Sequence, residues 1–308
     1  MASPQTQSNR LEVDSLRSLI PSWQLSLRAA NKAPRTLETY TLAAGQLAAF
    51  LDERGMPSAV HAIRREHVEA FIESVLANRS PATARQRHGS LLQLFNWLEE
   101  EGEIKASPMA KMKPPKVPEQ PVPVLNQDQL RDLLATVKGQ TFSEKRDNAL
   151  LRAFLDTGGR LAEITNLTVD DVDLDLKVLI VLGKGGRHRS VPFGNKTAQA
   201  LDRYLRLRRR HRLADRRELW LGKQGPLTRS GIFQLVRRRG LQAGIEGLHP
   251  HQLRHTFAHA WLAAGGQEGD LQRIAGWSSR QMLSRYGASA ASERAIEAHG
   301  QFGVVDRL

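Results

Sequence analysis

The chain has 308 residues, with 45 lysines and arginines against 32 aspartates and glutamates, and so carries a formal charge of +13. It contains no cysteine, which excludes a disulfide scaffold, a thiolate zinc site and a thiol nucleophile. The longest apolar run, residues 178–182, is too short to cross a bilayer, and the first ten residues lack the apolar core of a signal peptide. These features predict a basic, cytoplasmic protein of roughly two domains with no membrane partner, and the charge favours nucleic acid as its partner.

The N-terminal third of the chain has a helical pattern without strand signals. Residues 1–13 are polar and predict a flexible tail, while residues 14–104 predict a small all-helical domain. One helix is expected to begin at Pro34, because proline in the first turn lacks only an N–H that the helix does not use. Further helices are expected from about Arg65 and from Ser80, where a serine precedes a proline.

A proline-rich stretch follows this helical domain. Six of the fourteen prolines lie within residues 105–123, together with four lysines. Such a stretch cannot continue a helix and is typical of an extended, semi-rigid spacer. We therefore predict a linker at 105–123, a second domain at 124–287 and a separate C-terminal segment at 288–308.

The second domain shows a mixed pattern. Two short segments, 177–182 and 188–192, have the pattern of strands on either side of a glycine-rich turn and predict a β-hairpin. The rest follows helical periodicity, which predicts helices at 126–137, 144–156, 160–167, 195–212, 229–243, 250–264 and 268–286. The chain as a whole is thus expected to be mainly α with a small β-hairpin or sheet, an α+β fold.

Several signals for other functions fail or stay open. Asp171 begins like a calcium loop, but the sixth and twelfth positions of that loop are leucines. His251 and His255 are spaced as in a zinc-protease helix, but Gln252 replaces the general base. No phosphate-binding loop of the ATPase type occurs, so the sequence offers no cofactor and no metal site. The basic run 206–217 fits a solvated helix face or a DNA contact, and His88 fits a surface residue or a contact.

One set of residues has the chemistry of phosphodiester cleavage without a metal. An arginine follows a glycine turn in 157–163, a lysine lies at the tip of the predicted hairpin, and a histidine and an arginine share one helix face. A tryptophan stands nine residues before a tyrosine. Together they supply two phosphate-binding guanidinium groups, a proton donor, further N–H donors and a phenol nucleophile. The residues are Arg160, Lys184, His251, Arg254, Trp277 and Tyr286.

With these segments the chain resembles the tyrosine site-specific recombinases, which include phage integrases, Xer-type recombinases and Cre. The most specific motif runs from His249 to Ala258, and Trp277 and Tyr286 follow it at the family's spacing. Residues 157–164 and 183–187 add to the match, which covers about residues 15–290. The resemblance implies a SAM-like, core-DNA-binding first domain and a catalytic domain of the DNA breaking-rejoining type, in the minimal two-domain form.

The resemblance also implies a role for each residue. Arg160 and Arg254 would bind the scissile phosphate, and Tyr286 would attack phosphorus to give a 3′-phosphotyrosine. Lys184 would protonate the leaving 5′-oxygen, and His251 would assist proton transfer or donate to a phosphate oxygen. Neither ATP nor a metal is required. Supporting positions behind these groups would be Glu163 and His255.

One position departs from the commonest family pattern. Most integrases and Xer proteins have histidine where this chain has Trp277, whereas Cre has tryptophan. Because an indole N–H can donate but cannot accept a proton, Trp277 is expected to act as a phosphate donor and packing wall. The basic residues expected to contact DNA are Arg35, Arg64, Arg65, Arg79, Arg85, Arg87, Lys111, Lys113, Lys116 and Arg187.

The expected activity is therefore site-specific recombination of double-stranded DNA at core sites, by a homotetramer on two duplexes that is a monomer or weak dimer off DNA. It would serve integration or excision of a mobile element, or dimer resolution. Two alternatives stay open: a nicking and resealing enzyme like the type IB topoisomerases, and a DNA-binding regulator with vestigial cleavage. The sequence also leaves open a directionality factor and whether 288–308 docks on a neighbouring protomer or on its own domain.

Overall fold

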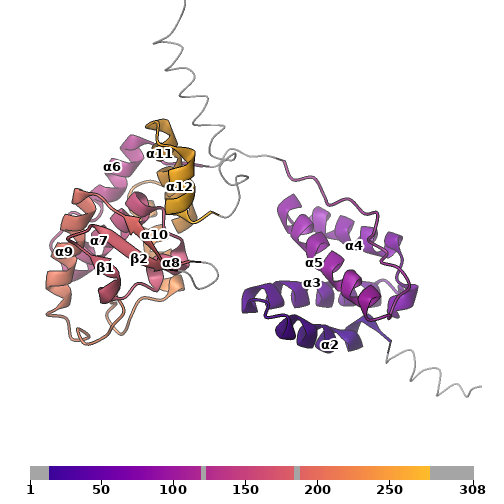
Figure 1. Ribbon diagram of the computed structural model, residues 1–308. Helices are drawn as coiled ribbons and strands as arrows, with labels where there is room; N and C mark the ends of the chain where they lie inside the picture. Colours follow the sequence, from indigo (N-terminus) through magenta and orange to yellow (C-terminus); the bar gives the residue numbers. More distant parts are fainter. Residues whose placement is uncertain (1–13, 119–122, 184–187, 278–308) are drawn as a thin grey trace, which may run out of the picture. The chain divides into compact units, whose positions relative to one another are not determined.

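The computed structural model describes residues 14–118, 123–183 and 188–277. The chain divides into two compact units, Met1–Glu119 and Gln120–Leu308 (Figure 1). The predicted tail at 1–13 and C-terminal segment at 288–308 lie outside the described residues. None of the helices in the described ranges is long and apolar enough to span a membrane.

The regular secondary structure in the described part of the first unit is helical. Local signals set the helix starts. Ser15 and Ser80 cap two of the helices by accepting the backbone N–H of Ser18 and Thr83. Pro34 and Pro81 each occupy the first turn of a helix. Helix α3 packs against α2, α4 and α5 around a leucine-rich core. The elements are α2 (Leu16–Ala29), α3 (Pro34–Glu53), the 3-10 turn η1 (Val60–Ala62), α4 (Arg65–Asn78) and α5 (Pro81–Glu100).

The beginning of the predicted linker belongs to the first unit. Met109 is 1% exposed and packs with Ile104 in the helical core, and the backbone N–H of Ser107 donates to the Glu99 carboxylate at 3.1 Å. The first part of the predicted linker therefore packs against the helical core through Met109 and is not a free spacer. His88, which the sequence placed at the surface or on DNA, is also buried, with 3% of its surface exposed. That expectation was wrong, because α5 turns this residue toward the core.

The second unit packs helices around a three-stranded antiparallel sheet of order β1-β2-β3. The predicted hairpin is confirmed: in it, Leu182 pairs with His188 next to the turn. The elements are α6 (Gln127–Ala135), α7 (Phe142–Thr157), α8 (Leu161–Thr165), η2 (Val169–Asp171), β1 (Val172–Asp173), β2 (Val178–Leu182), β3 (His188–Pro192), α9 (Asn195–Arg208), α10 (Arg229–Gln242), α11 (Pro250–Ala263) and α12 (Glu268–Ala275).

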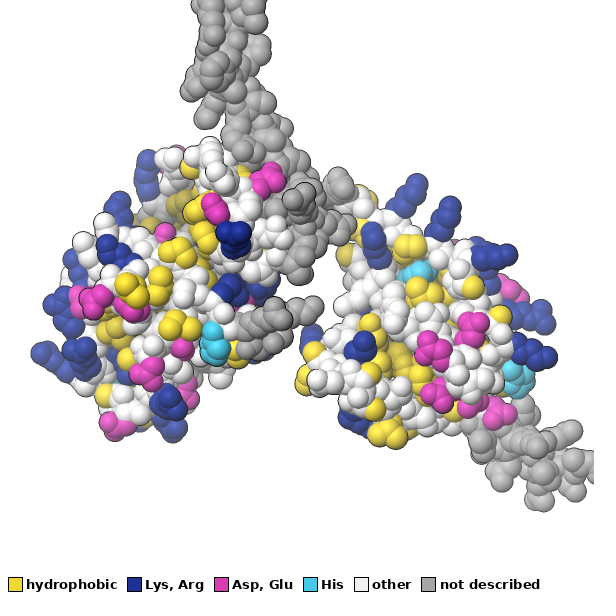
Figure 2. Space-filling model, viewed as in Figure 1, with side chains coloured by type: hydrophobic (Ala, Val, Ile, Leu, Met, Phe, Trp, Pro, Cys, Tyr) yellow, Lys and Arg dark blue, Asp and Glu magenta, His cyan; other side chains and the backbone are white. Residues whose placement is uncertain are grey.

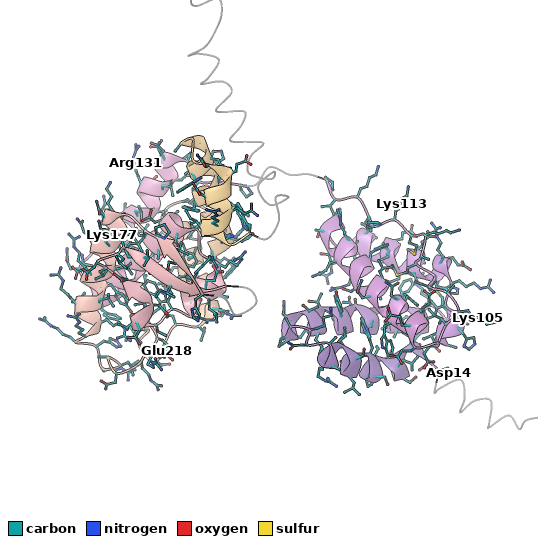
Figure 3. The ribbon with its side chains drawn as sticks, viewed as in Figure 1. Asp14, Lys105, Lys113, Arg131, Lys177 and Glu218 are labelled. Carbon is teal, nitrogen blue, oxygen red and sulfur yellow. The ribbon has the colours of Figure 1, made fainter. Side chains whose placement is uncertain are left out.

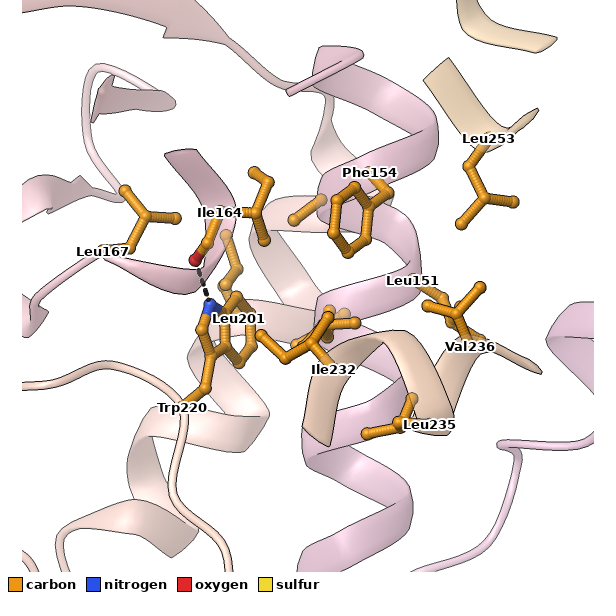
Figure 4. Packing of buried hydrophobic residues seen from close by; sticks show 14 of the residues in the cluster. Leu151, Phe154, Ile164, Leu167, Leu201, Trp220, Ile232, Leu235, Val236 and Leu253 are labelled. Carbon is orange, nitrogen blue, oxygen red and sulfur yellow. Dashed lines mark hydrogen bonds between the residues drawn. The ribbon is translucent and has the colours of Figure 1, made fainter. Parts of the chain in front are cut away.

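Trp220 occupies the centre of this unit's core. Its indole Nε1 donates to the carbonyl of Ile164 at 2.7 Å, which ties the loop after α9 to α8 (Figure 4). Its ring stacks on Tyr204, which is fully buried and donates from its hydroxyl to the Leu219 carbonyl at 2.7 Å. Burial raises the pKa of Tyr204 to about 12. Tyr204 is therefore a structural residue of the core.

The basic run 206–217 splits into two environments. Arg208 is 4% exposed and donates to several carbonyls of the loop that follows α9, including Leu219 at 3.1 Å and Glu218 at 2.7 Å. The other arginines of the run are exposed. Arg208 therefore holds the loop together by satisfying backbone acceptors, whereas its neighbours form a solvated surface.

Candidate active site

A tight glycine turn after α7 delivers Arg160. Gly158 has a φ of +58°, and a Cβ there would lie 2.3 Å from the ring of Phe257 on α11. A side chain at this position would therefore force α7 and α11 apart, besides straining the backbone. The turn places Arg160 just before α8, where its backbone N–H donates to the Glu163 carboxylate at 2.9 Å.

The guanidinium of Arg160 is anchored at two points. Its Nη1 donates to Glu163 Oε1 at 2.8 Å and its Nη2 donates to the carbonyl of Gly276 at 2.7 Å. The side chain stays 38% exposed. Arg160 is thus oriented by the protein while keeping part of its surface open to a ligand.

Arg254 lies on α11 and is almost completely buried, with 2% of its surface exposed. It donates to the carbonyl of Gly158 at 2.6 Å and to that of Ala275 at 2.7 Å. Its Cζ lies 5.2 Å from the centre of the Trp277 ring, within the range of a cation–π contact. The structure therefore brings together Arg160, Arg254 and Trp277, which the sequence predicted to share a site.

His251 and His255 lie one turn apart on α11, with their ring centres 4.2 Å apart in an edge-to-face arrangement. The His251 side chain is exposed. Desolvation lowers the pKa of His251, and the positive charges of Arg254, His249 and Arg160 lower it further. His251 therefore sits within electrostatic reach of both arginines as a neutral imidazole at neutral pH.

Three arginines converge on the last carbonyl groups of α12. Arg189 of β3 donates to Ile274 at 3.2 Å, Arg254 to Ala275 and Arg160 to Gly276. The C-terminal carbonyls of a helix have no partners within the helix and carry partial negative charge, so positively charged donors stabilise them. Trp277 follows directly.

Glu163 is the buried acid of the site, with 7% of its surface exposed. Arg189 donates to both of its oxygens at 2.9 Å, and Arg160 donates to them as well. Burial opposes ionisation of Glu163, but the hydrogen bonds from Arg189 and Arg160 outweigh it and lower the pKa to about 2. Glu163 is therefore a carboxylate that links two arginines.

Arg189 is the residue of this cluster that the sequence analysis missed. The period of two along β3 places it on the same side as buried Val191, while His188 and Ser190 are exposed. An arginine on the inward side of a strand needs a partner for its charge. That alternation was the signal that could have found it.

Lys184, Arg187 and Tyr286 lie outside the described residues. The described strands end on either side of the hairpin turn at Leu182 and His188, the pair next to it. In the part of the chain that the structure describes, no group of three or more His, Asp or Glu side chains is arranged to hold a metal ion.

The predicted DNA contacts of the first unit are at its surface, where Figure 2 shows many lysine and arginine side chains. Arg65, Lys111 and Lys113 line one hollow of about 390 Å³ between α4, α5 and the segment after them; Lys113 is labelled in Figure 3. Arg87 is half-buried and donates to Gln46 of α3 at 2.7 Å. The remaining candidates, all exposed, are Arg35, Arg64, Arg79, Arg85 and Lys116.

Both units match families of known proteins. Residues 123–293 match the phage integrase family, and residues 19–102 match the phage integrase N-terminal SAM-like domain. The chain is 31% identical over 222 residues to tyrosine recombinase XerC of Corynebacterium glutamicum, covering 71% of each chain.

Solved structures agree with this fold. The XerH site-specific recombinase bound to palindromic difH substrate superposes with a TM-score of 0.73 at 18% identity, covering 97% of this chain and 89% of that one. A lambda integrase tetramer bound to a Holliday junction gives a TM-score of 0.69 at 17% identity, covering 91% and 82%. With both units matched in order, the chain belongs to the phage integrase family and is a site-specific tyrosine recombinase.

Proposed function

We propose that this recombinase cleaves DNA by attack of the Tyr286 hydroxyl on a phosphodiester held by Arg160 and Arg254. The P–O5′ bond breaks as the P–O bond to tyrosine forms and the phenol proton passes to the neutral imidazole of His251, which yields a 3′-phosphotyrosine and a free 5′-hydroxyl. Lys184 supplies the proton to the departing 5′-oxygen. Because the bond energy stays in the covalent link, the 5′-hydroxyl of another strand can reverse the step without ATP.

The observation that carries this proposal is the joint anchoring of the two arginines. Arg160 and Arg254 come from positions 94 residues apart, yet they donate to the adjacent carbonyls of Gly276 and Ala275. A guanidinium is a planar group of N–H donors whose geometry matches the oxygens of a phosphate. Two fixed cations beside one another suit the extra negative charge of a pentacoordinate phosphorus, because they need no reorganisation as that charge develops.

Trp277 and His251 complete the proposed phosphate site. Trp277 packs against Arg254, and an indole N–H donates to an oxygen without accepting a proton. His251 is a neutral imidazole because its pKa is lowered, so it can donate one N–H to a phosphate oxygen or pass a proton through the ring. His255 stands beside it as a packing partner.

The proposed partner is double-stranded DNA, with four copies of the chain acting on two duplexes. The formal charge of +13 and the exposed arginines and lysines of the first unit support a clamp on the phosphate backbone. The lambda integrase relative is a tetramer on a Holliday junction, which supports the same assembly here. Residues 288–308 and a directionality factor are proposed participants in that assembly.

A covalent-trapping experiment tests the chemistry. The protein is incubated with a duplex that carries its core site and a nick, so that the cleaved strand fragment diffuses away and the adduct accumulates. We expect Tyr286→Phe to form no adduct while binding DNA within about twofold of wild type, since only the nucleophilic oxygen is lost.

Tyr204→Phe is the matched control, because Tyr204 is buried and hydrogen-bonded in the core. It should form the adduct at the wild-type rate per folded molecule. An adduct with Tyr286→Phe would assign the nucleophile elsewhere and refute the proposed chemistry. If the protein forms the adduct but produces no Holliday junction from two intact sites, the topoisomerase-like alternative is favoured.

A further inference from the structure

Arg189 uses all three of its nitrogen atoms on residues of the candidate active site. Nη1 and Nη2 each donate to one oxygen of Glu163 at 2.9 Å, and Nε donates to the carbonyl of Ile274 at 3.2 Å. The side chain is 18% exposed. A single guanidinium thus connects β3 with α8 and with the end of α12.

The bidentate pair fixes how Glu163 meets Arg160. Each Glu163 oxygen accepts one bond from Arg189 and one from Arg160, whose Nη1 and backbone N–H supply the two donors. A planar fork against a planar carboxylate allows little rotation of either group. The plane of the carboxylate, and with it the direction of the Arg160 guanidinium, therefore depends on Arg189.

The same guanidinium lies under the end of α12. A Cβ on Gly276 would lie 2.8 Å from Cζ of Arg189, so the backbone of residue 276 rests directly on the arginine. Gly276 has a φ of +62° and precedes Trp277. Loss of Arg189 would leave the Ile274 carbonyl without this donor and open a space beneath the turn that leads to Trp277.

We propose that Arg189 is a positioning residue for DNA cleavage, which sets the Arg160 guanidinium through Glu163 and holds the end of α12 through Ile274. It acts through these groups and does not bind the phosphate itself. It also joins the site to β3, the strand that begins four residues after Lys184. This inference rests on the proposed role of Arg160 as a phosphate-binding residue.

The test separates DNA binding from chemistry. Covalent adduct formation on the nicked duplex is measured at saturating DNA, and the dissociation constant is measured separately by fluorescence anisotropy. We expect Arg189→Met to slow adduct formation on the order of 10- to 100-fold, because a displacement of about 1 Å in a phosphate-binding group costs that much. Its dissociation constant should stay within about twofold of wild type.

Arg189→Lys guards against a variant that merely fails to fold. An ammonium group keeps the charge but cannot donate to both Glu163 oxygens and to Ile274 in the same planar geometry. We expect a cleavage rate between those of Arg189→Met and wild type. A wild-type rate for folded Arg189→Lys or Arg189→Met would overturn the proposal.

Arg208→Met is the control for a purely structural effect. Arg208 is even more buried, with 4% of its surface exposed, and also donates to backbone carbonyls, but it is the last residue of α9 and its acceptors lie in the loop that follows. It should lower the melting temperature and leave the cleavage rate per folded molecule unchanged. An equal rate loss in Arg208→Met and Arg189→Met would show that both act through stability alone and would refute the positioning role.

A double-mutant cycle with Glu163→Gln checks the route of action. If Arg189 acts largely through Glu163, Arg189→Met should slow cleavage much less in the Glu163→Gln background than in wild type. Full additivity would contradict that route. Failure of the proposed function is distinguishable, because in that case wild type and Arg208→Met would also form no adduct.

Discussion

The guanidinium of Arg254 lies over the ring of Trp277, with 5.2 Å between Cζ and the ring centre. Trp277 is itself 6% exposed and packs in a small cluster with Phe257, Leu262 and Leu271. The tryptophan thus covers one face of a buried arginine that also donates to two carbonyls. An aromatic face beside a desolvated cation holds that cation in place and excludes water from it.

Replacement of Trp277 should therefore show whether its side chain acts by packing against Arg254 or by transferring a proton. We expect Trp277→Phe to retain cleavage within about tenfold of wild type, because a ring face remains over Arg254 and no proton transfer is lost. Trp277→Ala should destabilise the fold by about 3 to 5 kcal/mol, the usual cost of removing a buried aromatic side chain, and slow cleavage more. Denaturant unfolding and adduct formation measure the two effects. A Trp277→Phe protein that is folded but as inactive as Tyr286→Phe would contradict the packing role.

Glu163 makes the free energy of unfolding depend on pH in the acidic range. Its pKa is lowered from 4.5 to about 2 in the folded protein, despite burial, by the hydrogen bonds from Arg189 and Arg160. The ionised form therefore stabilises the fold fully above about pH 4.5, and this contribution, at most about 3 kcal/mol, is lost as the pH falls toward 2. Urea unfolding of wild type and Glu163→Gln at pH 7 and pH 3 measures it.

We expect the stability difference between wild type and Glu163→Gln to shrink from pH 7 to pH 3. Asp202→Asn provides the control, since Asp202 also pairs with an arginine, Arg206, but on an exposed helix face. Such a pair contributes little, so this variant should follow the wild-type pH dependence closely. An unchanged difference for Glu163→Gln between the two pH values would contradict the lowered pKa.

Gly158 and Gly55 distinguish backbone strain from steric conflict. Both have positive φ, +58° and +62°, but a Cβ at Gly158 would meet Phe257 at 2.3 Å whereas nothing lies within 4 Å of one at Gly55. Gly55→Ala should cost about 1 to 2 kcal/mol of stability from the left-handed backbone alone. Gly158→Ala should cost more and also slow cleavage, because the Gly158 carbonyl accepts from Arg254. Equal losses of stability with normal cleavage in both would show that the close approach to α11 is unimportant.

Lys184 is proposed as the general acid, and the leaving group tests that role. We expect Lys184→Ala to slow cleavage of normal DNA on the order of 10²- to 10⁴-fold, the usual contribution of a general acid. A substrate with sulfur at the 5′-bridging position should restore most of the rate, because a thiolate leaves without a proton. Tyr286→Phe should show no such rescue. Absence of rescue for Lys184→Ala would move the acid role to another residue.

Local sequence accounts for most of the element positions. A serine before a proline starts α5 at Pro81, and an asparagine with glutamine three residues later starts α6. Two short segments about a glycine-rich turn predicted the hairpin strands, which the structure places at residues 178–182 and 188–192. The predicted helix at 160–167 is shorter in the structure, Leu161–Thr165, and the Ile164 carbonyl in its last turn accepts from Trp220. The helix starts and the hairpin therefore have causes within a few residues of one another, whereas the contact at the end of α8 joins residues 56 positions apart.

The sequence by itself also determined the family and the residues proposed for cleavage, because the order and spacing of the motifs can be read directly from the amino-acid sequence. Tertiary structure alone decided the burial of His88 and the partners of Arg189. Arg189 meets Glu163 across 26 positions and Ile274 across 85. Strand alternation indicates that Arg189 points inward, but not which carboxylate it meets. Contacts over such separations cost loop-closure entropy that only burial of the whole core offsets, so no local pattern specifies them.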